Sequence, residues 1–176
     1  MCGIAGYFSK SNNHSLGPFL EKAIAQLAKR GPDLQQARTL SQKVGFAHAR
    51  LSIIDTSAVA HQPMQDPTGR FTIIFNGEIF NFRELRATHL QGVQFTSHSD
   101  TEVLLQLYMK MGKACLNELN GFFSFALYDS VKEEVFLARD RFGIKPMLIY
   151  TDENMILFGS EMKALLQFPV TKEIDF

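Results

Sequence analysis

The chain has 176 residues, of which 45% are hydrophobic and 20% are charged, a composition typical of a folded globular protein. Lysine plus arginine equals aspartate plus glutamate at 18 each, so no excess charge favours binding to nucleic acid or to an anionic membrane. No apolar run is long enough to span a membrane. The N-terminus lacks a basic segment followed by a long apolar stretch, so we expect no secretory signal.

The cysteines and histidines favour a reducing compartment and no metal site. Cys2 and Cys115 make a poor disulfide framework, so we expect a cytoplasmic protein. The histidines are scattered without an HExxH motif, and no CxxC pair is present, which argues against a zinc site. Neither a P-loop nor a GxGxxG motif occurs, so the chain offers no visible nucleotide cradle.

Strand and helix patterns alternate along the first half of the chain. The first helix is predicted where apolar residues recur at helical spacing, and Pro18 fits its first turn. Arg30-Gly31-Pro32-Asp33 has the composition of a rigid turn that could border a site. The predicted elements are a strand at 2–8, a helix at 16–30, strands at 44–51 and 70–77, and a short helix at 82–90.

The second half begins with a helix signal. Ser99-Asp100-Thr101-Glu102 has the spacing of a capping box, and Gly112 marks the end of the helix that comes after it. Ser160 is predicted to cap the last helix, and Arg139-Asp140-Arg141 is predicted to form an ion-pair cluster in a turn. The other elements are strands at 121–129, 134–140, 147–150 and 155–159, with a hairpin turn at 152–154, and a helix at 160–168.

The order of these elements indicates the fold class. Several strands are apolar at consecutive positions, which predicts sheets buried on both faces. Helices lie both between the strands and after them, so we expect a layered α+β architecture. The length is sufficient for one domain with a substantial core.

Cys2 directly follows the start methionine, and two interpretations are open. If Met1 is removed, Cys2 carries a thiol and a free α-amine on one α-carbon. Their pKa values, about 8.5 and about 7.7–8.0, lie near neutrality, so the amine could act as general base while the thiol attacks a carbonyl. Alternatively, Cys2 is a small buried residue that begins a strand, and its position alone favours this simpler interpretation.

Asn76-Gly77 also has two interpretations. The Asn76 side-chain amide and the Gly77 N–H could converge on a developing oxyanion, where one such donor typically contributes about 2.7–4 kcal/mol of transition-state stabilisation. Asn-Gly is equally a strong hairpin signal. However, the residues after Gly77 do not alternate like a returning strand, and the two interpretations remain balanced.

A small zwitterionic substrate would require a cation and one or two carboxylates. Arg50, at the end of a predicted strand, could bind a carboxylate with two hydrogen bonds, and Glu78 and Asp100 could bind an ammonium group. The alternatives are a solvated arginine at a strand end and an aspartate that interacts with the helix dipole.

Taken in order, eight segments of the chain are similar to a known family. They are MCGIAGYF, RGPD, ARLSIID, QPM, NGEIFNFRELR, SDTEVL, RDRFGIKP and SEMKAL. The sequence resembles the glutaminase domain of glutamine-hydrolysing asparagine synthetases, which are class II glutamine amidotransferases of the N-terminal-nucleophile hydrolase superfamily. This resemblance implies an α+β fold of αββα sandwich type, with two mainly antiparallel sheets between helical layers.

The resemblance also implies a chemistry and a set of site residues. Met1 would be excised to expose Cys2 as the nucleophile, with its own amine as base, and glutamine would be hydrolysed without a metal or organic cofactor. The other implied roles are Asn76 and Gly77 as the oxyanion hole, Arg50 as the ligand of the glutamine carboxylate, Glu78 and Asp100 as ligands of its ammonium group, and backbone around Leu51 and Ile53 as the pocket lining.

Partners and boundaries are implied by the same resemblance. We expect a glutamine amidotransferase domain at 1–167 and, at 168–176, a tail or the start of a linker. The implied partner is an ATP-dependent synthetase domain or subunit, which alone would use ATP and magnesium, and a homodimer is compatible with this family. If Met1 is retained, the alternative is a non-catalytic glutamine-binding or docking module. A second rival is an amidase of the same superfamily that acts on another amide.

Overall fold

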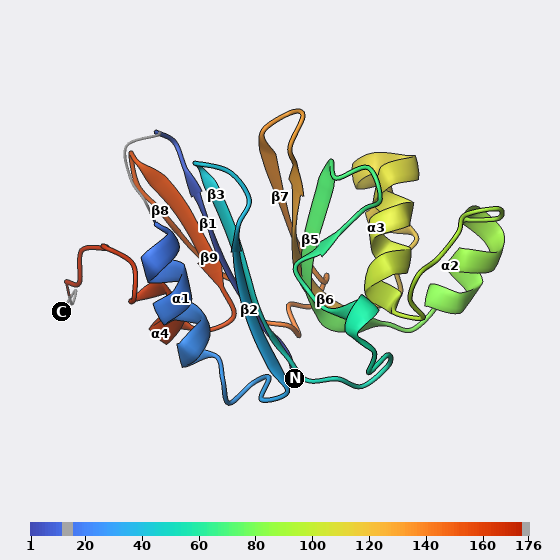
Figure 1. Cartoon of the computed structure of the whole chain (residues 1–176), viewed down its shortest axis with the longest axis horizontal. Helices are drawn as coiled ribbons and strands as arrows, with labels where there is room; N and C mark the ends of the chain where they lie inside the picture. The colour runs from blue at the N-terminus through green and yellow to red at the C-terminus, as the bar shows by residue number, and fades with distance from the viewer. Residues whose placement is uncertain (12–15, 174–176) are drawn as a thin grey trace. The chain divides into compact units, whose positions relative to one another are not determined.

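The computed structural model describes residues 1–11 and 16–173, which form two compact units (Figure 1). Unit 1 is built from both parts of the chain that flank unit 2, up to Leu51 and from Pro146 onward, and unit 2 contains Ser52–Lys145. Each unit has its own antiparallel sheet and its own cluster of buried hydrophobic side chains. Among the described residues, each sheet therefore has a hydrophobic cluster of its own.

The described residues of unit 1 form a five-stranded antiparallel sheet in the order β2-β3-β1-β9-β8. The strands are β1 at Gly3–Ser9, β2 at Leu34–Thr39, β3 at Val44–Arg50, β8 at Leu148–Thr151 and β9 at Met155–Gly159. In the central strand, Gly3 lies opposite Ala49 of β3 and Ala5 lies opposite Gly159 of β9. Chain ends usually fray unless a sheet or a docked helix fixes them, and here the first strand is paired on both sides.

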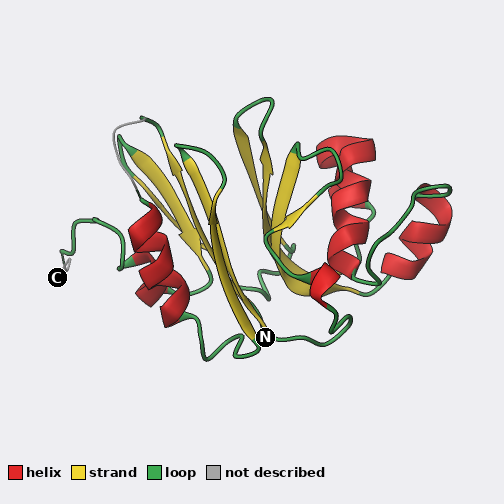
Figure 2. Cartoon of the chain, in the orientation of Figure 1, coloured by secondary structure: helices red, strands yellow, loops and turns green. Residues whose placement is uncertain are grey.

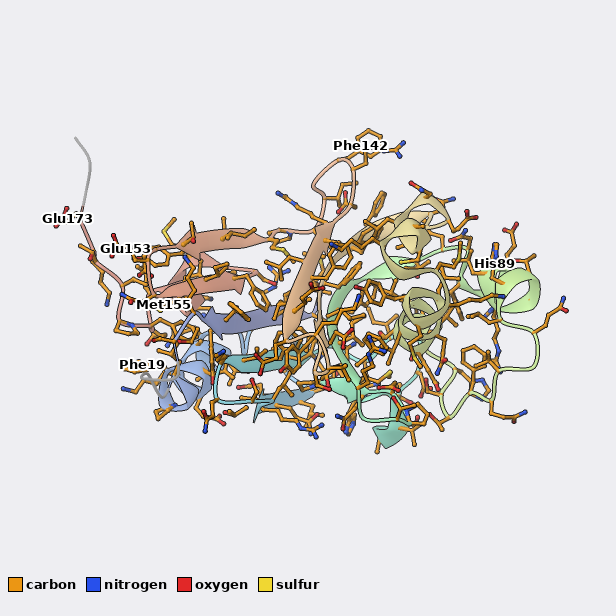
Figure 3. The ribbon with its side chains drawn as sticks, turned by 90° about the horizontal axis from the view of Figure 1, so that it is seen from above. Phe19, His89, Phe142, Glu153, Met155 and Glu173 are labelled. Carbon is orange, nitrogen blue, oxygen red and sulfur yellow. The ribbon has the colours of Figure 1, made fainter. Side chains whose placement is uncertain are left out.

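Helices α1 (Gly17–Gln26) and α4 (Met162–Leu165), which are labelled in Figure 1 and drawn in red in Figure 2, belong to unit 1. The helix α1 packs on β1, β2 and β3 and against α4, and its residues Leu20 and Ile24 enter the hydrophobic cluster. Phe19 packs against this cluster and Met155 belongs to it (Figure 3). The amphipathic spacing that predicts the first helix thus also identifies the face that it buries.

The helix α1 is shorter than the predicted range of 16–30. After Gln26 the backbone tightens into turns: Leu27 N–H bonds to the Ile24 carbonyl at 2.9 Å, and Arg30 N–H bonds to the Leu27 carbonyl at 2.9 Å. These are three-residue bonds of the kind that close helix ends. Pro32 disfavours helical backbone at the residue before it, Gly31, so the helix cannot continue through this segment.

Unit 2, all of whose residues are described, forms a four-stranded antiparallel sheet in the order β4-β5-β6-β7. Its α-helix α3 packs on β5, and α2 packs on α3. Phe75 and Ile79 of β5 and Leu104 of α3 lie in one buried cluster. The elements are η1 at Ala58–Ala60, β4 at Met64–Gln65, β5 at Phe71–Ile79, α2 at Phe82–His89, α3 at Asp100–Met111, η2 at Gly112–Asn117, β6 at Gly121–Asp129 and β7 at Glu134–Arg139.

The predicted capping residue of α3 is confirmed. The Ser99 hydroxyl accepts a hydrogen bond from Glu102 N–H at 3.2 Å, and Gly112, with φ 60°, ends the helix. The Glu102 carboxylate accepts from the N–H groups of Thr96 at 2.9 Å and Ser97 at 2.6 Å. This carboxylate therefore fastens the loop that leads into the helix.

The predicted cap of the last helix is wrong. The N-cap of α4 is Glu161, and the Ser160 hydroxyl accepts a hydrogen bond from Ile4 N–H at 3.0 Å. Ser160 N–H in turn donates to the Ile4 carbonyl at 2.8 Å. Ser160 thus extends the attachment of β9 to β1, and the pairing between strands takes the hydroxyl that a helix cap would use. Phe168 is buried and packs edge-on against Tyr7 with ring centroids 6.2 Å apart.

The expected ion-pair cluster at 139–141 is also wrong. The Asp140 carboxylate accepts hydrogen bonds from the backbone N–H groups of Phe123, Phe142, Ile144 and Lys145, at distances from 2.9 to 3.3 Å. Arg139 donates to the carbonyl of Lys145 at 2.7 Å and to that of Gly143. These backbone contacts shape a tight loop after β7, with an exposed Phe142 at its outer end (Figure 3).

Candidate functional site

Cys2 lies immediately before β1 and is half-buried. Its sulfur accepts a hydrogen bond from Leu51 N–H at 3.4 Å and lies 3.6 Å from the Leu51 carbonyl, to which it can donate. A backbone N–H directed at sulfur stabilises negative charge that develops there. The antiparallel pairing of β1 with β3 produces this contact, because it brings the start of β1 to the end of β3.

The turn that contains Arg30 lies against the same end of the sheet. Arg30 Nε donates to the Cys2 carbonyl at 2.9 Å, and its Nη1 lies 3.2 Å from Glu161 Oε1. A Cβ at Gly31 would lie 2.2 Å from the Ala49 backbone, so only glycine allows this approach. Sequence reasoning places Arg30 only in a turn that could border a site and assigns Glu161 no role. The signal that could have found both is their presence in RGPD and SEMKAL.

Arg50 and Leu51 complete the predicted residues of unit 1. Arg50 is the last residue of β3 and is only 5% exposed, so the interpretation as a solvated strand-end arginine is wrong. A buried guanidinium is rare unless it is paired or held in a polar site. Ile53, which comes next in unit 2, is 70% exposed. Its predicted contribution comes from the backbone, and its exposed side chain does not affect that prediction.

In unit 2, Asn76 and Gly77 lie inside β5, opposite Ser124 and Phe123 of β6. The hairpin interpretation of this dipeptide is therefore wrong. A Cβ at Gly77 would lie 2.3 Å from the Phe122 carbonyl oxygen, so this close approach of the two strands requires glycine. Asn76 is 1% exposed, and its Nδ2 is buried without a hydrogen-bond partner among the described residues. A buried donor in this state is rare and indicates a function or a missing acceptor.

Asp100 lies at the first position of α3 and is buried, whereas Glu78 on β5 is exposed. The Asp100 carboxylate accepts a hydrogen bond from Ile79 N–H at 3.0 Å, so the start of α3 is attached to the strand that carries Asn76. Burial raises the pKa of Asp100 to about 6, and nearby Glu78 adds to this, while the N–H groups of Ile79 and Thr101 oppose it. The Asp100 carboxylate is thus largely anionic at neutral pH, as a cation site requires.

The structure therefore brings the predicted residues together in two groups. Unit 1 holds the Cys2 group, in which the nucleophile candidate contacts Leu51 and Arg30. Unit 2 holds the Asn76 group, in which Asn76, Gly77 and Glu78 are consecutive on β5 and Asp100 bonds to the next residue of that strand. The first group offers a thiol, and the second offers a free hydrogen-bond donor and two carboxylates.

Two structural features are absent from the described residues. No group of three or more histidine, cysteine, aspartate or glutamate side chains within residues 1–11 and 16–173 could share a metal ion. No helix in these ranges is both long and apolar enough to cross a membrane.

Comparison with known proteins identifies the family. A model of the glutamine amidotransferase domain matches residues 1–176, and the chain belongs to this family. It is 39% identical over 173 residues to asparagine synthetase [glutamine-hydrolyzing] 2 of Bacillus subtilis strain 168, covering 96% of this chain and 23% of that protein. It is 38% identical over 179 residues to asparagine synthetase B [glutamine-hydrolyzing] of Escherichia coli K12, covering 99% of this chain and 31% of that protein.

Solved structures confirm the predicted fold class. Glutamine phosphoribosylpyrophosphate amidotransferase from B. subtilis superposes with a TM-score of 0.74 at 20% identity, covering 93% of this chain and 43% of that chain. The likeness shows that the two proteins share an α+β sandwich fold. The chain is thus a glutamine amidotransferase domain like those of asparagine synthetases, and it spans about a quarter to a third of the curated relatives named above.

Proposed function

We propose that this chain hydrolyses L-glutamine to glutamate and ammonia through a γ-glutamyl thioester on Cys2. Removal of Met1 frees the Cys2 amine, which accepts the thiol proton as sulfur attacks the side-chain carbonyl carbon of glutamine. The protonated amine then donates a proton to the leaving ammonia. Water attacks the thioester, which releases glutamate and regenerates the thiol.

The residues of the Asn76 group would stabilise the same reaction. The oxyanion formed by thiol attack would accept hydrogen bonds from Asn76 Nδ2 and Gly77 N–H. The observation that carries this assignment is that Asn76 Nδ2 is buried without a hydrogen-bond partner among the described residues, because a donor reserved for a transition state is left unpaired by the fold itself. A purely structural asparagine would have satisfied this donor.

Substrate recognition would use the charged residues. Arg50 is proposed to bind the α-carboxylate of glutamine, and Glu78 and Asp100 its α-ammonium group, with backbone near Leu51 and Ile53 lining the pocket. The burial of Arg50 and Asp100 supports these roles, because ion pairs in a largely desolvated site are stronger than at an exposed surface. This half-reaction requires no metal or organic cofactor.

The released ammonia is proposed to serve an amidation such as asparagine synthesis by a synthetase domain or subunit, which would use ATP and magnesium. The similarity to glutamine-hydrolysing asparagine synthetases supports this proposal. A homodimer, a cytoplasmic location, and a domain that ends near residue 167 remain predictions from the family resemblance.

The decisive experiment measures glutamate release from glutamine by the purified chain and determines the N-terminal residue in the same sample. We expect activity only in preparations that begin with cysteine. Full activity in a preparation that begins with methionine would refute the amine-assisted mechanism. Binding of glutamine without hydrolysis, in chains that retain Met1, would instead favour the non-catalytic module.

A further inference from the structure

The main chain of Cys2 is held by Arg30. Once Met1 is removed, Cys2 has no preceding peptide, and its backbone is held through its own carbonyl and through the strand that begins at Gly3. Gly3 pairs with Ala49, and the Cys2 carbonyl accepts a hydrogen bond from Arg30 Nε at 2.9 Å. This contact holds the Cys2 carbonyl in place and with it the neighbouring α-carbon. The amine and the side chain that carries the thiol both extend from this α-carbon, so the contact orients both groups.

Arg30 is in turn held by Glu161. Arg30 Nη1 lies 3.2 Å from Glu161 Oε1, and the two side chains are 13% and 28% exposed. The residue before Glu161, Ser160, is bonded twice to Ile4 of β1. The end of β9 therefore lies beside the start of β1 and places Glu161 at the end of the sheet that is next to Cys2. Lys163 binds the other carboxylate oxygen of Glu161 at 2.7 Å.

Stability alone does not explain this arrangement well. Arg30 Nη2 is buried without a hydrogen-bond partner among the described residues, and an unpaired buried donor destabilises the fold. A neutral apolar side chain would fill the space beside Leu27 and Gly3 without this cost. An arginine, however, presents several donors in a rigid fork, so it can grip a carbonyl and a carboxylate together.

From these contacts we infer that Glu161 is a positioning residue for the nucleophile and acts through Arg30, which clamps the Cys2 carbonyl. The inference rests on the proposed function, because it assigns Cys2 as the attacking residue. Neither side chain needs to touch glutamine in this role. Loss of the clamp would disorder the attacking group and leave the affinity for glutamine largely intact.

The test compares Arg30→Lys, Glu161→Ala, Glu161→Gln and the double variant Arg30→Lys/Glu161→Ala, with Lys163→Gln as the matched control. Lys163 contacts the same carboxylate but not Arg30 or Cys2. Misplacement of a reacting group by about 1 Å can cost about 10²-fold in rate, so kcat should fall about 10²-fold in Arg30→Lys and about tenfold in Glu161→Ala. Values of KM should change less than about threefold, and Lys163→Gln should stay within about twofold of wild type in both constants.

Two features distinguish positioning from a general loss of structure. The double variant should be no slower than Arg30→Lys, because Glu161 acts through Arg30. Glu161→Gln, which keeps an acceptor for Arg30, should recover part of the kcat lost in Glu161→Ala, and this pair decides the question if Arg30→Lys does not fold. Thermal unfolding identifies variants that have lost the fold.

A second measurement does not depend on glutamine. Iodoacetamide alkylation of Cys2 is located by mass spectrometry. Its rate should stay near that of wild type in Lys163→Gln, fall in Glu161→Ala and fall further in Arg30→Lys, because the thiol loses its fixed contact with Leu51 N–H. If wild type alkylates at Cys2 but releases no glutamate, the proposed function fails while the clamp is still tested by this order. Full kcat in folded Glu161→Ala, effects confined to KM, additive effects in the double variant, or an unchanged alkylation rate would each overturn the inference.

Discussion

The Cys2 group and the Asn76 group differ in how their polar atoms are satisfied. Cys2 is held through sulfur by Leu51 N–H at 3.4 Å and through its carbonyl by Arg30 at 2.9 Å. Asn76 is buried more deeply, yet its Nδ2 has no partner among the described residues. The fold thus fixes the proposed nucleophile in advance but leaves the proposed oxyanion donor free for a ligand. Such preorganisation of the attacking group and of the stabilising donor is what rapid acyl transfer requires.

The largest expected effect tests the nucleophile side of this comparison. Cys2→Ala should lower kcat for glutamine hydrolysis by at least about 10⁴-fold, because removal of a nucleophile abolishes covalent catalysis. The matched control is Cys115→Ala: Cys115 is fully buried, and burial raises the pKa of its thiol to about 11, so it is a structural thiol. Glutamate release should persist in this control. Comparable losses in both variants would show that the effect is one of folding.

Removal of the proposed oxyanion donor should have a smaller effect on kcat than removal of the nucleophile, but the effect should still be large. Asn76→Ala should lower kcat by about 10²- to 10³-fold, the usual result of removing one oxyanion donor. Because Nδ2 has no acceptor within the part of the chain that the structure describes, the thermal midpoint should change little through hydrogen bonding. The control is Asn81→Ala, since Asn81 donates to the Glu118 carbonyl at 2.9 Å and accepts from Asn120 N–H at 3.0 Å.

The control should therefore show the opposite pattern, a loss of stability with kcat nearly unchanged. The two variants together separate a donor used in catalysis from a donor used in folding. Measured by steady-state kinetics and thermal unfolding, equal kcat for Asn76→Ala and wild type would remove Asn76 from the oxyanion hole.

A third prediction concerns Asp100 and pH. With a pKa of about 6 in the folded protein, about a tenth of Asp100 is ionised at pH 5, so KM for glutamine should rise about tenfold between pH 7.5 and pH 5. In Asp100→Asn, KM should be high at both pH values. The measurement is KM over this pH range, and a constant KM in wild type would contradict the role of Asp100 as an ammonium ligand.

The raised pKa of Asp100 also predicts how stability depends on pH: low pH should weaken glutamine binding but stabilise the fold. The ordinary pKa of 3.8 is raised to about 6 on folding, so the folded protein binds more protons than the unfolded chain between these values. The buried carboxylate thus costs at most about 3 kcal/mol above pH 6 and nothing below about pH 4. Asp100→Asn should therefore be more stable than wild type at pH 7.5 and equally stable near pH 3.5, as measured by chemical denaturation.

Sequence patterns predicted most of the fold because most elements carry a local signal. The strands at 121–129 and 155–159 occur with the predicted bounds, and Ser99 caps α3. The strand β2, Leu34–Thr39, was missed because it is a polar, largely exposed edge strand whose order comes from pairing with β3. Its sequence, LQQART, lacks the apolar alternation of a strand.

The site was less accessible to sequence reasoning for a related reason. Residue types and the family resemblance indicated Cys2 and Asn76, but that Asn76 Nδ2 is buried without a partner among the described residues is visible only in the folded structure. The contacts of Arg30 with Cys2 and Glu161 join segments 28 and 131 residues apart in the chain. No local pattern encodes such contacts, because they depend on strand order in the sheet.

The smallest effects are expected for Ser160 and Ser99, two serines whose sequence context predicts a helix cap in both cases. Ser160→Ala removes the acceptor of a buried Ile4 N–H, which should cost about 1–3 kcal/mol. Ser99→Ala removes a helix cap and should cost about 1 kcal/mol. Only Ser160 lies beside the strand that begins after Cys2, so Ser160→Ala should also lower kcat, whereas Ser99→Ala should lower the free energy of unfolding and leave kcat unchanged. Denaturant titration and glutamate release on both variants provide the check, and a kcat effect of equal size in both would show that the attachment of β1 to β9 does not support the nucleophile.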